Sequence, residues 1–147
     1  MKSGLYDIKS KNDFQIFEFT SEGPKGKILK EVQYAKTQTP DLYILGFGDK
    51  NHLTGNINDT VVTNNGDSQK VITTVAATVE MFMKQYPHAL IYATGSNKVR
   101  TRLYRMLISN NLNLIKENFE VLGLKNDEYY LFEKNTDYDG FLLFRKI

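Results

Sequence analysis

Residues 88–108 read HALIYATGSNKVRTRLYRMLI, an apolar run that leads through a small polar turn into a segment rich in arginine. The apolar run at residues 89–93 has the length and composition of a buried strand. The turn at residues 94–97 contains glycine and side chains of the types that cap helices, so a helix is expected to follow it. This strand, turn and helix form the unit around which we interpret the rest of the chain.

Positive charge is concentrated in this unit and its flanks. Residues 81–116 contain no Asp or Glu and six basic side chains, among them Arg100, Arg102 and Arg105. The whole chain has a net charge of +2, so this region of +6 leaves −4 on the remainder. A guanidinium group matches the geometry of phosphate, and elsewhere the chain mostly uses lysine. The pattern therefore indicates an anion site, or alternatively a solvated helix face that pairs with the protein's own carboxylates.

Composition restricts the class of protein. The 147 residues fit one domain, residues 1–147, and the absence of cysteine excludes disulfides and thiolate catalysis. Two histidines argue against a histidine-rich metal site. No run approaches the ~20 apolar residues of a membrane span, so we expect a cytoplasmic protein without a membrane partner.

Hydrophobic periodicity predicts two helices among several strands. An amphipathic helix is expected from about Asp67 to Pro87, with an apolar face made of Val71, Ile72, Val75, Val79, Phe82, Met83 and Tyr86. The second helix is expected to end near Asn110 and to place Val99, Leu103, Met106 and Leu107 on one face. Strands are expected at residues 13–20, 28–34, 42–48, 59–63, 89–93, 119–124, 129–133 and 141–146. This order predicts an α+β fold, a largely antiparallel sheet with two main helices packed on it.

The two helix N-termini are the first candidate binding sites. A helix N-terminus presents unpaired N–H groups and the positive end of the helix dipole, which together favour phosphate or carboxylate. If the preceding strands are neighbours, both N-termini open at one edge of the sheet. Ordinary helix capping is the competing explanation. The candidate residues are Asn64, Asn65, Gly66, Asp67 and Ser68 at the first helix, Thr94, Gly95, Ser96 and Asn97 at the second, and the arginines Arg100, Arg102 and Arg105.

Residues 62–67 and 92–105 resemble an uncharacterised family of small bacterial proteins, found mainly in Bacteroidetes. The similarity extends over nearly the whole chain. It implies a small stand-alone bacterial protein and no particular activity.

Residues 42–124 also resemble the central part of the GNAT acyltransferases. Asn97, Leu103 and Tyr104 occupy places similar to an Asn and a Leu-Tyr pair of that superfamily, and residues 64–68 stand where its pyrophosphate-binding turn would be. The resemblance implies acetyl-CoA as cofactor and Tyr104 as general acid, although a tyrosine on a helix stripe is more often part of the core. The sequence departs from the superfamily in having one glycine in the turn and no Gly-Phe after Tyr104.

Three functions follow from these patterns, and the sequence does not choose among them. The first is binding of a phosphate-bearing ligand, a nucleic acid or a nucleotide, as in a toxin–antitoxin or phage-defence component. A pI of 8.6 is modest for a dedicated nucleic-acid domain. The second is GNAT-like acyl-CoA-dependent transfer. The third is a protein-interaction module, whose basic helix meets an acidic partner or a second copy of the chain as a homo-oligomer.

Overall fold

The computed structural model describes residues 4–50, 57–58, 65–95 and 98–146. The described chain forms nine strands and three helices. The strands are β1 (Lys9–Lys11), β2 (Ile16–Gly23), β3 (Gly26–Lys36), β4 (Leu42–Lys50), β5 (Ile57–Asn58), β6 (Leu90–Ala93), β7 (Phe119–Lys125), β8 (Glu128–Leu131) and β9 (Gly140–Arg145). The helices are α1 (Ser68–Gln85), α2 (Lys98–Asn110) and α3 (Leu112–Asn118).

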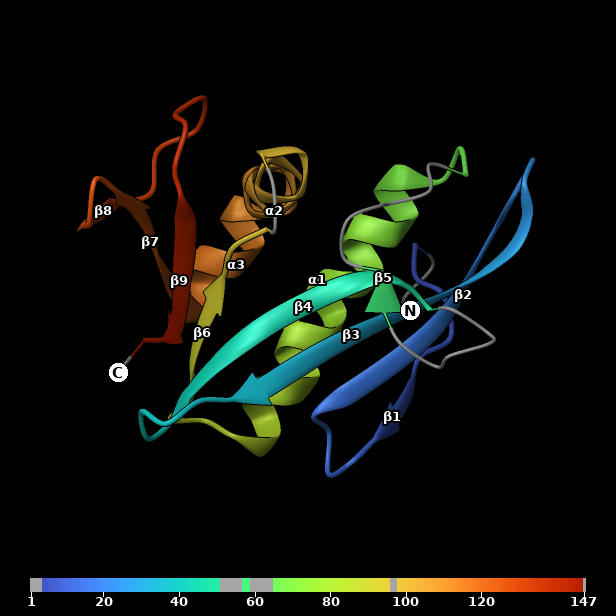
Figure 1. The fold of residues 1–147 in the computed structure, drawn as a ribbon, viewed down its shortest axis with the longest axis horizontal. Helices are drawn as coiled ribbons and strands as arrows, with labels where there is room; N and C mark the ends of the chain where they lie inside the picture. Colours follow the sequence, from blue (N-terminus) through green and yellow to red (C-terminus); the bar gives the residue numbers. More distant parts are fainter. Residues whose placement is uncertain (1–3, 51–56, 59–64, 96–97, 147) are drawn as a thin grey trace.

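The strands form one sheet in the order β1-β2-β3-β4-β6-β9-β7-β8, and β5 pairs with β4 (Figure 1). Among the described strand pairs only β4 and β6 are parallel, and their register joins Leu42–Leu45 to Leu90–Ala93. All other pairs are antiparallel. The predicted α+β fold with a largely antiparallel sheet is confirmed.

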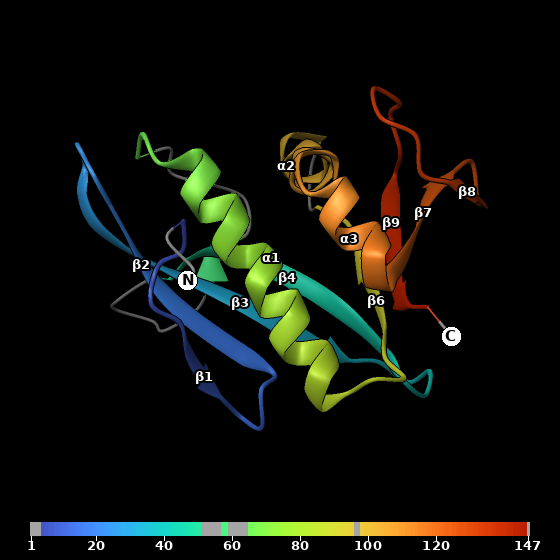
Figure 2. The same ribbon diagram turned by 180° about the vertical axis from the view of Figure 1, so that it is seen from behind.

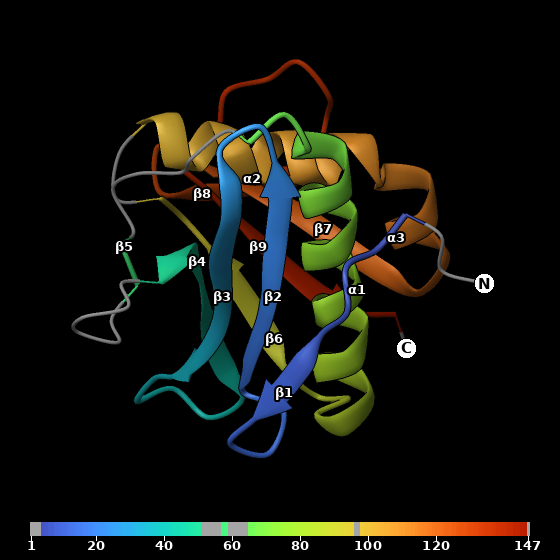
Figure 3. The same cartoon turned by 90° about the vertical axis from the view of Figure 1, so that its right-hand side faces the viewer.

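The helices pack against one face of the sheet, which we call the helix-covered face (Figures 2 and 3). The opposite face is called the outer face below. Successive side chains of a strand alternate between the two faces. Phe17, Val32 and Phe47 lie in register on the helix-covered face and are at most 2% exposed.

The face predicted for the first helix is buried in α1, except that Tyr86 lies just after the helix and is half-buried. Phe82 is the centre of an aromatic cluster, with its ring centroid 4.2 Å from Tyr34 and 4.9 Å from Tyr43. The predicted start near Asp67 and the end before Pro87 are also confirmed, because α1 runs from Ser68 to Gln85. The cluster joins α1 to β3 and β4 and closes this part of the core.

The face predicted for the second helix is wrong in part. Val99 is 74% exposed and Met106 is 42% exposed, while Tyr104, Leu107 and Ile108 are buried. The segment contains two overlapping apolar stripes at helical spacing, and the sequence pattern does not decide between them. Packing against α1 and the sheet selects the stripe that includes Tyr104.

The strands β1 and β5 and the helix α3 were not among the expected elements. The helix α3 was not predicted, because Asn110 and Asn111 were read as the end of helical structure. The chain does break at Asn111, but it resumes a helix at once, with the backbone N–H of Ile115 donating to the Asn111 carbonyl. The strand expected at residues 59–63 lies outside the described residues. Within the described part of the chain, none of the helices has both the length and the hydropathy needed to cross a membrane.

Candidate functional site

The N-termini of α1 and α2 lie toward the same end of the sheet. The strands β4 and β6 are adjacent and parallel, α1 comes after β4 in the chain, and α2 follows β6 directly. Figure 1 shows the first turns of both helices toward the top of the view. The strand expected directly before the first helix, residues 59–63, lies outside the described residues, so the common edge stays a prediction. Of the predicted residues there, Asn64, Ser96 and Asn97 lie outside the described residues, as do the side chains of Ser68 and Arg100.

Asn65, before the N-terminus of α1, is 1% exposed and holds the turn between β2 and β3. Its side-chain oxygen accepts a hydrogen bond of 2.7 Å from the backbone N–H of Lys25, and its amide nitrogen donates one of 2.8 Å to the carbonyl of Gly26. A Cβ atom at Gly23 would lie 1.9 Å from the Asn65 carbonyl oxygen, so this close approach requires glycine. These contacts give Asn65 a structural role.

Asp67 binds the N-terminal segment of the chain to α1. Its carboxylate accepts hydrogen bonds from the Tyr6 hydroxyl at 2.6 Å and the Ser21 hydroxyl at 2.5 Å, and it makes no side-chain cap of the helix. Burial and the bond to Asp67 together raise the pKa of Tyr6. Gly66 beside it is exposed and has a φ of 76°. The first N-terminus thus already holds a carboxylate of the protein.

The turn before α2 is tied to the loop that precedes β9. The Thr94 hydroxyl donates a hydrogen bond of 2.8 Å to the carbonyl of Asp139, and the Gly95 N–H donates one of 3.0 Å to the hydroxyl of Thr101. Thr101, on the second turn of α2, was not among the predicted site residues. A threonine at this spacing after a glycine is too common to have indicated the role.

The arginines of α2 differ in their surroundings. The Arg105 guanidinium forms an ion pair of 2.5 Å with Asp137, whose side chain is 95% exposed. Arg102 is exposed, and no carboxylate of the described residues lies within ion-pair distance of it. Of the two guanidinium groups described in α2, that of Arg105 is paired with a carboxylate of the protein, and that of Arg102 has no such partner among the described residues.

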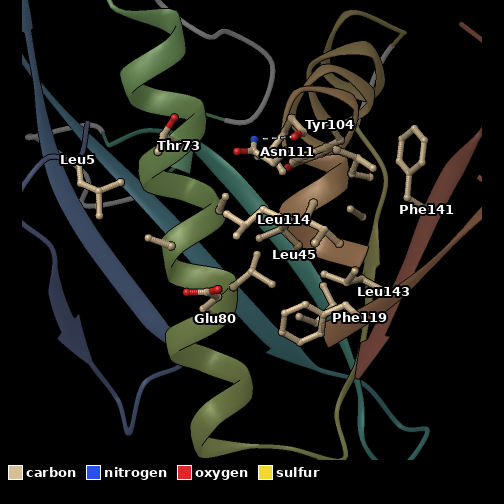
Figure 4. A pocket seen from close by; sticks show the side chains of 18 of the residues that line it. Leu5, Leu45, Thr73, Glu80, Tyr104, Asn111, Leu114, Phe119, Phe141 and Leu143 are labelled. Carbon is tan, nitrogen blue, oxygen red and sulfur yellow. Dashed lines mark hydrogen bonds between the residues drawn. The ribbon is translucent and has the colours of Figure 1, made fainter. Parts of the chain in front are cut away.

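Tyr104 belongs to a different feature, a cavity of about 290 Å³ between the three helices and the sheet (Figure 4). The side chain is 2% exposed and lines this cavity. It also lies near Tyr34, whose pKa is raised by burial and by the proximity of Tyr104. The sequence did not predict the cavity. The small residues Ala76 and Ala77 in α1, on the side facing α2, were a signal that could have indicated it.

A metal centre has no support among the described residues, where no three His, Asp or Glu side chains gather as a metal ion would require. The described geometry therefore contains two distinct features, a pair of helix N-termini beside an exposed arginine and an apolar cavity. Together with the fold they define an α+β domain in which all three helices cover one face of the sheet.

Residues 2–146 match the model of a family of unknown function, DUF6934, and the chain belongs to this family. The expectation of an uncharacterised family that covers nearly the whole chain is confirmed. No curated protein and no solved structure matches the chain.

Proposed function

We propose that the protein binds a small phosphate-bearing molecule where α1 and α2 begin. The observation that carries the proposal is the parallel pairing of β4 with β6, which brings both N-termini to one end of the sheet. Neither helix has an acidic residue in its first turn, and no side chain caps α1. The positive end of the α2 dipole therefore favours an anion there, whereas the Asp67 carboxylate already lies at the start of α1.

The charge distribution favours a nucleotide-sized ligand over a nucleic acid. A nucleic-acid surface needs several basic side chains along one face, because each phosphate contact releases counterions. In α2 the guanidinium of Arg105 is paired with Asp137, so Arg102 is the exposed arginine that remains among the described side chains of the helix. A single phosphate or pyrophosphate group matches this arrangement better than an extended backbone. The described residues add no support for a toxin–antitoxin role.

An acyl-CoA-dependent acyltransferase is the second candidate, and coenzyme A is itself a phosphate-bearing molecule. The order strand, loop, helix, strand, helix, strand, on which the resemblance to GNAT acyltransferases rests, is present as β4, α1, β6, α2 and β7, with α3 added before β7. In this second proposal Tyr104 is the general acid. Its position in the wall of an apolar cavity supports the proposal, because such a cavity has room for part of a small substrate.

Thermal unfolding in the presence of ADP, acetyl-CoA and a short single-stranded oligonucleotide tests both proposals. A ligand at 100 times its dissociation constant stabilises the folded state by about 2.7 kcal/mol. We expect ADP and acetyl-CoA to raise the melting temperature and Arg102→Gln to reduce the shift. The matched control is Lys36→Gln, because Lys36 is exposed and lies at the other end of the sheet, opposite Tyr43 at the start of β4.

The outcomes separate the candidates. Stabilisation by acetyl-CoA with turnover of an acyl acceptor would favour the acyltransferase, and stabilisation by ADP without turnover would favour a binding protein. Stabilisation by the oligonucleotide alone would show that the charge argument is wrong. If none of the three ligands binds at low salt, the proposed anion site does not exist.

A further inference from the structure

The cavity between α1, α2 and α3 is separate from the helix N-termini. Its volume of about 290 Å³ is about twice that of an apolar cavity known to admit benzene, which is ~150 Å³. It has the size of a small ligand pocket, and most of its lining is apolar. From the sheet it is lined by Leu45, Ile91, Ala93, Phe119, Phe141 and Leu143.

The space exists because α1 presents small side chains toward the other helices. Thr73, Ala76, Ala77 and Glu80 line the cavity, and their spacing places them on one stripe of α1 (Figure 4). This stripe lies beside the fully packed stripe that contains Phe82. Large side chains in place of Ala76 and Ala77 would fill the cavity, so the two alanines leave the space between the helices.

Four side chains supply polar atoms to the wall, and two of them donate to backbone carbonyls four residues earlier in the chain. The Thr73 hydroxyl donates to the Gln69 carbonyl, and the Asn111 amide donates to the Leu107 carbonyl, both at 2.8 Å. Tyr104 also has an interaction of its own. Glu80 is different, because it is half-buried and makes no hydrogen bond or ion pair with any described residue. Among the described residues of the wall, its carboxylate is therefore the polar group without a partner in the protein.

We propose that this cavity binds a small molecule with an apolar body and a cationic, hydrogen-bond-donating end. The body occupies the apolar cavity and the cationic end lies against the carboxylate of Glu80. An anionic end would be repelled by the same carboxylate in surroundings of low polarity. The site goes beyond the proposed phosphate site, since a phosphate-bearing ligand has the opposite charge.

Three molecules with the same eight-carbon body test the charge preference, namely octylamine, octanol and octanoate at pH 7. We expect octylamine to bind at least about tenfold more tightly than octanoate, a ratio that corresponds to about 1.4 kcal/mol. Octanol should lie between them. Isothermal titration calorimetry measures the three dissociation constants, and ¹H–¹⁵N spectra locate the perturbed residues.

Two variants separate the apolar body from the charged end. Ala77→Phe fills the cavity and should abolish binding of both octanol and octylamine, while thermal unfolding checks that the variant folds. Glu80→Gln should leave the affinity for octanol unchanged and remove the preference for octylamine. The matched control is Glu117→Gln, because Glu117 is an exposed carboxylate of α3 that does not line the cavity.

The proposal is overturned if none of the three molecules binds, or if octanoate binds as tightly as octylamine. It is also overturned if Glu80→Gln leaves the preference for the amine unchanged. Because the phosphate proposal is tested with ADP and Arg102→Gln, either proposal can fail without the other.

Discussion

In both halves of the sheet the side chains alternate between the two faces, but the halves differ in the residues that lie on the outer face. In the half made of β1 to β4 the outer face is charged, with Glu18 directly opposite Glu31 in the register. Lys50 forms ion pairs with both carboxylates, at 2.5 Å and 3.3 Å, and Lys11 pairs with Glu18 at 2.8 Å. Two like charges that would repel across the strands are thereby bridged.

The half made of β6, β9, β7 and β8 has a mostly apolar outer face instead, on which Glu120 pairs with Lys146 at 3.8 Å. By register it carries Leu90, Tyr92, Leu142, Phe144, Leu122, Leu124, Tyr129 and Leu131, and Ile44 of β4 adjoins it. Leu131 is 71% exposed and Tyr129 is 50% exposed. The same half leaves the cavity under α2 and α3 on its helix-covered face. The first half is packed by α1 on its helix-covered face and bridged by ion pairs on its outer face, and we call it the closed half. The second half, called the open half, leaves a cavity on its helix-covered face and exposes apolar side chains on its outer face.

Replacing the centre of the closed half should have the largest effect. We expect Phe82→Ala to reduce the free energy of unfolding by about 3–5 kcal/mol, because it removes a fully buried ring from a stack with Tyr34. Leu114→Ala, at a residue that lines the cavity and is 53% exposed, should cost less than about 1 kcal/mol. Urea titration measures both. Equal losses would show that the two halves are packed alike.

Replacing the buried Lys30 of the closed half should have the next largest effect on the free energy of unfolding. Lys30 is 1% exposed on the helix-covered face and pairs with Asp49. Lys30→Met leaves that carboxylate without its ammonium partner, and the expected loss is about 2–3 kcal/mol, since the Asp49 side chain is 17% exposed and keeps some water. The double variant Lys30→Met with Asp49→Asn should recover part of the loss in urea titration. No recovery would mean that the ion pair is not the cause.

Acidification should reduce the stabilisation that the ion pairs of the charged outer face give to the fold. Burial opposes ionisation of Glu18, but the ammonium groups of Lys11 and Lys50 outweigh it and hold the pKa of that carboxyl below its usual value. Its stabilisation is therefore present above the pKa of an unfolded glutamate, about 4.3, and is lost as the pH falls through the lower folded value. We expect Glu18→Gln to cost about 0.5–1 kcal/mol at pH 7 and almost nothing at pH 2. A loss independent of pH would contradict this explanation.

A substitution on the uncovered face should have the smallest effect. Leu131→Ser removes a side chain that is 71% exposed, so the free energy of unfolding should change by less than about 0.5 kcal/mol. Phe141→Ser on the helix-covered face of β9, where the side chain is 1% exposed, is the matched contrast and should be severely destabilising. Thermal unfolding measures the loss of stability in both variants. A large effect at Leu131 would show that this face is covered in solution.

The sequence predicts the closed half better than the open one, for a physical reason. The α1 stripe around Phe82 has one apolar face at helical spacing, so burial follows from the pattern alone. In α2 two stripes compete, and the tertiary contacts of Tyr104 decide between them. The short α3 was missed because Asn110 and Asn111 indicated the end of the helix, and its apolar side chains are only partly buried.

The position of the candidate site stays a prediction, because the strand expected before the first helix, residues 59–63, lies outside the described residues. The parallel pair of β4 and β6 still places α1 and α2 after neighbouring strands of the sheet. Asn65 and Asp67 instead bind Lys25, Gly26, Tyr6 and Ser21, contacts with residues about 40 to 60 positions away that no local pattern contains. The cavity depends on the distance between helices, which is likewise a property of the whole fold.

The place of β9 has a consequence for how the chain reaches its native state. This last strand lies between β6 and β7, so neither of them can complete its pairing until residues 140–145 have been synthesised. The hairpins of β2, β3 and β4 join neighbouring segments and can form early, while the second half waits for distant contacts that form slowly. During translation the nascent chain would therefore expose the edges of β6 and β7 until residues 140–145 emerge, and this interval favours misassembly.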